Sequence, residues 1–71
     1  MADAMVFKGT IGINGDPGVL PSSGYKAGWT YRIITPGTYA NVNCEIGDII
    51  IAIADGSDSS SIINNSHWTV I

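Results

Sequence analysis

The sequence predicts a small, compact all-β domain, a barrel or sandwich of five or six short strands, that spans residues 1–71. Three observations support this fold class. β-branched residues, aromatic residues, glycine and asparagine dominate, whereas good helix formers are sparse. No window of a dozen residues repeats apolar side chains at helical spacing, and several short windows alternate as strands do. A chain of 71 residues also has room for one domain and no more.

The first expected strand is residues 5–11, and a glycine-rich loop at about residues 12–24 ends it. Glycine recurs at every third position from Gly9 to Gly18, as in collagen, but the four triplets hold a single proline. We therefore interpret the segment as a loop. Within it, Asp16-Pro17-Gly18 is typical of a turn, because proline restricts φ and glycine accepts a positive φ.

Two further alternating windows follow. Residues 27–35 predict a strand that places Trp29, Tyr31 and Ile33 on one face. Residues 38–46 predict another strand, whose apolar face carries Val42, Cys44 and Ile46. Gly47-Asp48 is typical of a tight corner into the next strand.

The run from Ile49 to Ala54 has no alternation, so we expect both of its faces to be covered. It is either a central strand or a strand whose second face meets another subunit. A polar loop at about residues 55–66 follows, and residues 67–71 predict a short last strand with Trp68 and Val70 on one face.

Composition excludes several classes of partner. Three basic residues against six acidic ones give a net charge of −3, so we expect no nucleic-acid binding. The same scarcity of lysine and arginine argues against anionic membrane surfaces. The longest apolar run is too short to cross a bilayer, and the first residues lack the apolar core of a secretion signal. The single Cys44 forms no internal disulfide and fits a reducing cytoplasm.

No catalytic or cofactor-binding set is apparent, so we expect neither an enzyme nor a bound cofactor or metal. Cys44 lies on an apolar strand face and His67 stands alone, without an orienting third group. Asp55 and Asp58 offer oxygen ligands, but the spacing of a calcium-binding EF-hand is absent. We interpret their segment as a solvated loop, with a weak calcium site as the alternative.

A domain of this size buries only about 60% of the surface that its unfolded chain exposes, and without disulfide or metal it needs another source of stability. Self-association is the remaining source. The expected contact residues are apolar side chains of the first strand and of the isoleucine-rich strand: Phe7, Ile11, Ile49, Ile51 and Ile53.

Aromatic side chains in small β domains usually form the core, although they also build platforms on which sugars stack. Tyr25 and Tyr39 lie in turn-like contexts, so they are the aromatic side chains that we expect at the surface. They are the candidate glycan-binding residues.

Several short blocks follow one another along almost the whole chain: Lys8-Gly9-Thr10, Leu20-Pro21, residues 28–39, residues 44–56 and Trp68-Thr69-Val70. This series resembles a module of the fibre proteins of tailed bacteriophages, the head fibre proteins in particular. The resemblance implies a non-enzymatic virion component, assembled in the host cytoplasm as a homotrimer. Such a component decorates the capsid or forms part of a fibre, so its partners are other copies of itself and capsid or fibre proteins. The alternative is a carbohydrate-binding adhesin module of a tail fibre that contacts a host-surface glycan.

Overall fold

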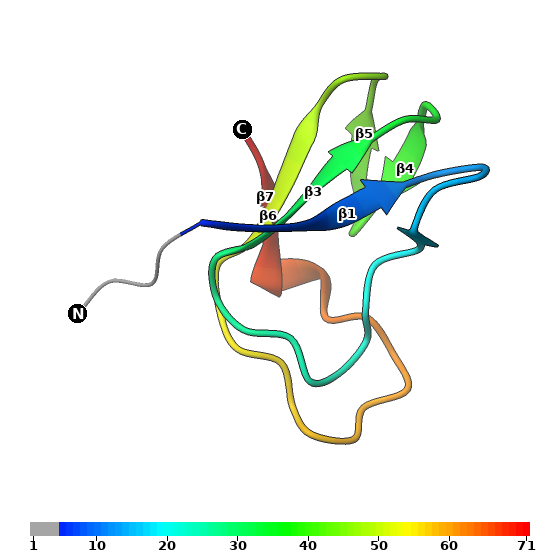
Figure 1. The fold of residues 1–71 in the computed structure, drawn as a ribbon. Coiled ribbons are helices and arrows are strands. Elements are labelled where there is room, and N and C mark those ends of the chain that lie inside the picture. The colour runs from blue at the N-terminus through cyan, green and yellow to red at the C-terminus, as the bar shows by residue number, and fades with distance from the viewer. Residues whose placement is uncertain (1–4) are drawn as a thin grey trace.

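The structure is a computed structural model that describes residues 5–71. It is a small, compact all-β fold, which confirms the predicted class (Figure 1). The strands are β1 (Val6–Ile11), β2 (Pro17–Gly18), β3 (Trp29–Ile33), β4 (Gly37–Tyr39), β5 (Val42–Cys44), β6 (Ile49–Ala52) and β7 (Trp68–Val70). A short 3₁₀ helix, η1 (Asn65–His67), leads into β7. The described residues contain no α-helix.

Five strands form one sheet in the order β2-β1-β3-β6-β7, and β4 and β5 form a separate hairpin. β1 runs parallel to both β2 and β3, whereas β6 is antiparallel to β3 and β7. The isoleucine-rich strand is therefore central in the sheet, between β3 and β7, as one of the two sequence-based alternatives predicted. Ile50 and Ala52 are buried on one face of β6, and Ile49 and Ile51 are half-buried on the other.

The core lies on one face of the five-stranded sheet, where the β4–β5 hairpin and the long loops pack. Its members are Ile11, Leu20, Tyr25, Tyr31, Ile33, Ala40, Cys44, Ile50, Ala52 and Trp68. Tyr31 and Ile33 are buried and Trp29 packs against the core, so the face predicted for β3 is correct. We call this side of the sheet the core face and the opposite side the outer face.

The single strand predicted over residues 38–46 is wrong. Ala40 and Asn41 have φ values of 48° and 64°, and they turn the chain so that β5 folds back on β4. Positive φ at two successive residues is the geometry of a tight hairpin turn, and asparagine tolerates it better than most residues. Cys44 is buried as expected, but Val42 and Ile46, expected on the same apolar face, are exposed.

The segment Asp16-Pro17-Gly18 also differs from a simple turn, because Pro17 and Gly18 form β2 and pair with the end of β1. The pairing is very close. A Cβ on Gly9 would lie 2.0 Å from the backbone oxygen of Asp16, so β1 passes this point only because Gly9 has no side chain.

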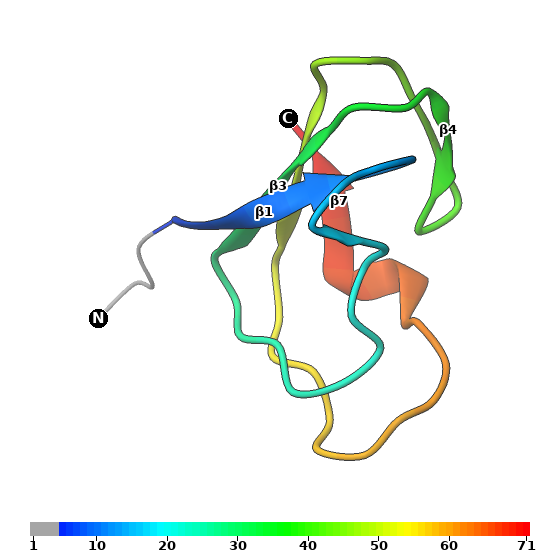
Figure 2. The same ribbon diagram turned by 45° about the vertical axis from the view of Figure 1, so that its right-hand side comes forward.

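Two long loops lie side by side below the sheet in Figures 1 and 2. The loops are residues 19–28 and residues 53–64. Four hydrogen bonds connect them: Gly24 N to Ser57 O, Gly56 N to Tyr25 O, Ala27 N to Asp55 Oδ1 and Ser22 Oγ to Ser60 O. Because each loop satisfies backbone groups of the other, the polar loop predicted at about residues 55–66 is part of the packed structure.

Candidate functional site

The outer face of the five-stranded sheet is the candidate functional site. Strand register places Phe7 of β1, Thr30 of β3, Ile51 of β6 and Thr69 of β7 in one row across four strands. Thr10, Arg32 and Ile49 form the next row. The core elements pack on the other side of the sheet, so this row of side chains has no second layer within residues 5–71.

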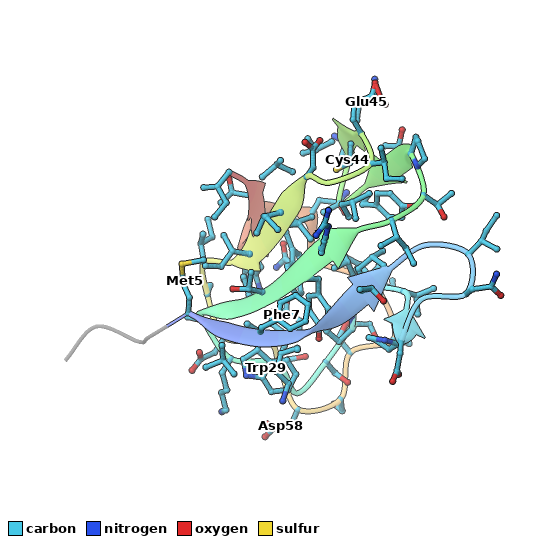
Figure 3. The ribbon with its side chains drawn as sticks, turned by 45° about the horizontal axis from the view of Figure 1, so that its top comes forward. Met5, Phe7, Trp29, Cys44, Glu45 and Asp58 are labelled. Carbon is cyan, nitrogen blue, oxygen red and sulfur yellow. The ribbon has the colours of Figure 1, made fainter. Side chains whose placement is uncertain are left out.

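The central row is apolar at its surface. Phe7 is 64% exposed and lies between β1 and β3 in Figure 3, beside Thr30, with which it pairs. Thr30 is buried, and its hydroxyl donates to its own chain at Gly28 O over 2.9 Å. Its hydrogen-bonding capacity is thus used internally. Phe7 and the half-buried Ile51 therefore present a hydrophobic surface to solvent.

Four of the five predicted contact residues are accessible at least in part. Phe7 and Ile53 are exposed, and Ile49 and Ile51 are half-buried. The assignment of Ile11 is wrong, because its side chain is fully buried in the core beside Ile33. A side chain that is closed off inside its own fold has no surface left for a second chain.

A β-bulge explains the error at Ile11. Regular alternation would place Phe7 and Ile11 on the same face, since they are four residues apart. The register instead shifts between Phe7 and Gly9, so that Phe7 pairs with Thr30 whereas Gly9 pairs with Tyr31. The extra residue at Lys8 moves the rest of β1 to the opposite face. The Lys8 ammonium, in turn, lies 4.2 Å from the ring centroid of Trp29.

Tyr25 is not at the surface, so this part of the glycan-site prediction is wrong. Its side chain is 1% exposed and packs against Trp68 at 4.9 Å between ring centroids. Its hydroxyl lies 2.7 Å from His67 Nδ1, and His67 Nε2 lies 3.2 Å from Asn64 Nδ2. The turn-like sequence around Tyr25 correctly indicated a loop, but the second loop covers that side chain.

Tyr39 is half-buried and packs against the core. Its hydroxyl donates to Thr35 O over 2.7 Å, which holds the ring against the base of the β4–β5 hairpin. Tyr39 therefore offers part of one ring to a ligand rather than a free aromatic platform. No pocket opens beside it or elsewhere on the surface of residues 5–71.

Cys44 and His67 have separate surroundings. The Cys44 thiol donates to Val42 O over 3.5 Å, whereas both His67 ring nitrogens are engaged by Tyr25 and Asn64. Burial raises the pKa of the Cys44 thiol, the Asp48 carboxylate raises it further, and a backbone hydrogen bond at Tyr39 opposes these effects. A raised pKa lowers the fraction of reactive thiolate, which is the opposite of what a catalytic cysteine needs.

In the acidic loop, Asp55 makes a structural contact. Asp55 Oδ1 accepts a hydrogen bond from Ala27 N at 2.8 Å and so holds the two long loops together. Within residues 5–71, no three histidine, cysteine or acidic side chains group as metal ligands would. The same part of the chain has no helix with the length and apolar character to cross a membrane.

Comparisons with protein-family models, with curated proteins and with solved structures gave no match for this chain.

Proposed function

We propose that this chain is a non-enzymatic structural protein of a tailed-bacteriophage virion, a head fibre or capsid decoration module that acts as a homotrimer. The observation that carries the proposal is the outer face of the sheet, where Phe7, Ile49 and Ile51 form an apolar surface on rigid strands. Apolar patches on rigid elements of small proteins commonly mark protein–protein contacts. The blocks that resemble phage fibre proteins supply the biological setting.

The size of the domain supports self-association. A domain this small buries only about 60% of the surface of its unfolded chain. Symmetric association would bury more apolar surface, and closed rings of identical subunits are the usual way to achieve it.

The alternative function, a carbohydrate-binding adhesin module, loses most of its structural basis. Tyr25 is buried, and Tyr39 retains part of one ring at the surface. Sugar-binding sites of this type depend on exposed aromatic faces. We therefore keep the structural role as the proposal and treat glycan binding as an outcome to be measured.

The test has three parts. Sedimentation equilibrium over a wide concentration range should show a species of three times the monomer mass, and mass spectrometry of purified particles of the phage that encodes this chain should detect it. A chain that stays monomeric and is absent from particles would refute the proposal. A glycan array probed with the same protein should be blank, and binding that Tyr39→Ala removes would favour the adhesin function instead.

A further inference from the structure

We infer that Asn14 is a site of spontaneous deamidation, and that its conversion to isoaspartate makes opening of the β1–β2 loop irreversible. The β1–β2 loop, residues 12–16, extends beyond the end of β1 in Figure 1. Asn14 is exposed in this loop and is followed by Gly15. The inference does not depend on the function proposed above.

The reaction uses the Asn14 side chain, the next main-chain amide and water. The Gly15 nitrogen attacks Asn14 Cγ, its proton and the side-chain amide group leave together as ammonia, and a five-membered succinimide ring closes. Water then opens the ring at one of its two carbonyl groups. Attack at the side-chain carbonyl gives aspartate, and attack at the main-chain carbonyl gives isoaspartate. Glycine favours ring closure, because no Cβ hinders the approach of its nitrogen.

Asn14 is the asparagine best suited to this reaction. The following residue carries a side chain at each of the other asparagines: Asn41, Asn43, Asn64 and Asn65. These four are exposed as Asn14 is, so access to water does not distinguish them. The identity of the next residue does.

The native loop restrains the attacking nitrogen. Gly15 N–H donates to Gly12 O over 2.9 Å, and Asn14, with φ of 64°, is the third residue of this turn. Ring closure removes the proton from Gly15 N, so this hydrogen bond has to break first. Three further hydrogen bonds hold the loop: Gly12 N to Gly18 O, Ile13 N to Thr35 Oγ1 and Asp16 N to Thr10 Oγ1. The reaction therefore requires local opening of the loop.

The isoaspartate product does not fit the native loop. It adds one methylene group to the main chain between Gly12 O and Gly15 N, the two groups that the turn joins. The main chain is tightly packed here: a Cβ on Gly12 would lie 2.6 Å from Thr35 Cβ, and one on Gly15 would lie 2.8 Å from Thr10 O. We therefore expect isoaspartate to remove the turn and to weaken the adjoining β1–β2 pairing. Aspartate keeps the length of the main chain and tolerates a positive φ as asparagine does.

The test follows deamidation of the full chain by peptide mass spectrometry and detects isoaspartate with a protein isoaspartyl methyltransferase. In mildly alkaline buffer with urea, Asn14 should convert before any other asparagine. Without urea it should convert at least about tenfold more slowly. Thr35→Val removes the acceptor of Ile13 N–H and should speed the folded-state reaction about three- to tenfold. Thr38→Val is the matched control, because the Thr38 hydroxyl donates to Asn43 Oδ1 within the β4–β5 hairpin. It should leave the Asn14 rate unchanged.

A second measurement tests irreversibility. Chain that has reacted in urea is returned to buffer, and the isoaspartyl fraction is separated by chromatography. Its Tm should be lower than that of unreacted chain by about 4–8 °C or more, because the turn cannot re-form. The Asn14→Asp variant should unfold close to the wild-type Tm.

Three results would overturn the inference: another asparagine converts first in urea, Asn14 converts as fast in the folded chain as in urea, or the isoaspartyl fraction regains the wild-type Tm. Equal folded-state rates for Thr35→Val and Thr38→Val would overturn the role of the loop hydrogen bonds as the barrier. None of these results bears on self-association, so the proposed function is tested separately.

Discussion

Two adjacent residues of β6, Ile50 and Ile51, should respond very differently to the same truncation. They differ in the face of the sheet that they occupy: Ile50 is fully buried in the core, and Ile51 is half-buried on the outer face. Replacing each by alanine removes the same atoms. The difference in effect therefore measures the surroundings of the side chain and nothing else.

The expected magnitudes follow from burial. Each methylene-sized group removed from the core costs about 0.8 kcal/mol, so Ile50→Ala should cost about 3 kcal/mol once its cavity is included. Ile51→Ala leaves no closed cavity, and we expect a loss of about 1 kcal/mol in the monomer. A domain of this size has a total stability of about 4–10 kcal/mol. The Ile50 variant would therefore lose a large part of its stability, with Tm lower by about 12–24 °C, against about 4–8 °C for the Ile51 variant.

Urea and thermal unfolding, followed by tryptophan fluorescence, measure both values. Trp68 is suited to this purpose because it is buried and packs against Tyr25 and Tyr31. The measurements should be made below the concentration at which copies associate. Equal losses for the two variants, or a larger loss for Ile51→Ala, would refute the assignment of Ile50 to the core and Ile51 to the outer face.

Three further predictions concern other positions. Gly56→Ala should lower stability by about 1–3 kcal/mol in urea unfolding, because the new Cβ would lie 2.5 Å from Tyr25 Cε2; a neutral effect would contradict this packing. Trp68→Phe should cost less than about 2 kcal/mol in the same assay, because the buried indole N–H has no partner to lose; a larger loss would mean that this N–H is satisfied. The Cys44 thiol should react with a thiol reagent much more slowly in the folded chain than in urea, and fast labelling would contradict its burial. Because its pKa is raised on folding, its contribution to stability is fully present below about pH 8.5 and is lost as the pH rises above that value.

Local patterns in the sequence predicted four of the strands well. β1, β3, β6 and β7 lie inside or close to the windows expected for them, because β-branched and aromatic residues favour extended backbone whatever the tertiary context. The central position of β6 was one of two alternatives. Its run of isoleucines predicted that both faces would be covered, whereas Ile49 and Ile51 are only half-buried on the outer face.

The accessibility of the expected contact residues was predicted in part, and their role in a contact stays a prediction. Phe7, Ile49, Ile51 and Ile53 were identified because they are apolar residues in strand-like segments. Ile11 was assigned to the same surface, although it lies in the core. A single inserted residue in β1 changes the face of every residue after it, and no local signal marks where the register shifts.

The sequence by itself determined the class of fold and the position of its main strands. It also determined the low content of charged residues, which is low on the outer face as well. These properties depend on each residue and its near neighbours. Tertiary structure decided which side each residue faces: it buried Tyr25 beneath a loop about thirty residues away in sequence, divided residues 38–46 into a hairpin, and placed Phe7 outside but Ile11 inside. Those outcomes depend on pairings between distant segments, whose free energy is gained only when the whole chain is folded.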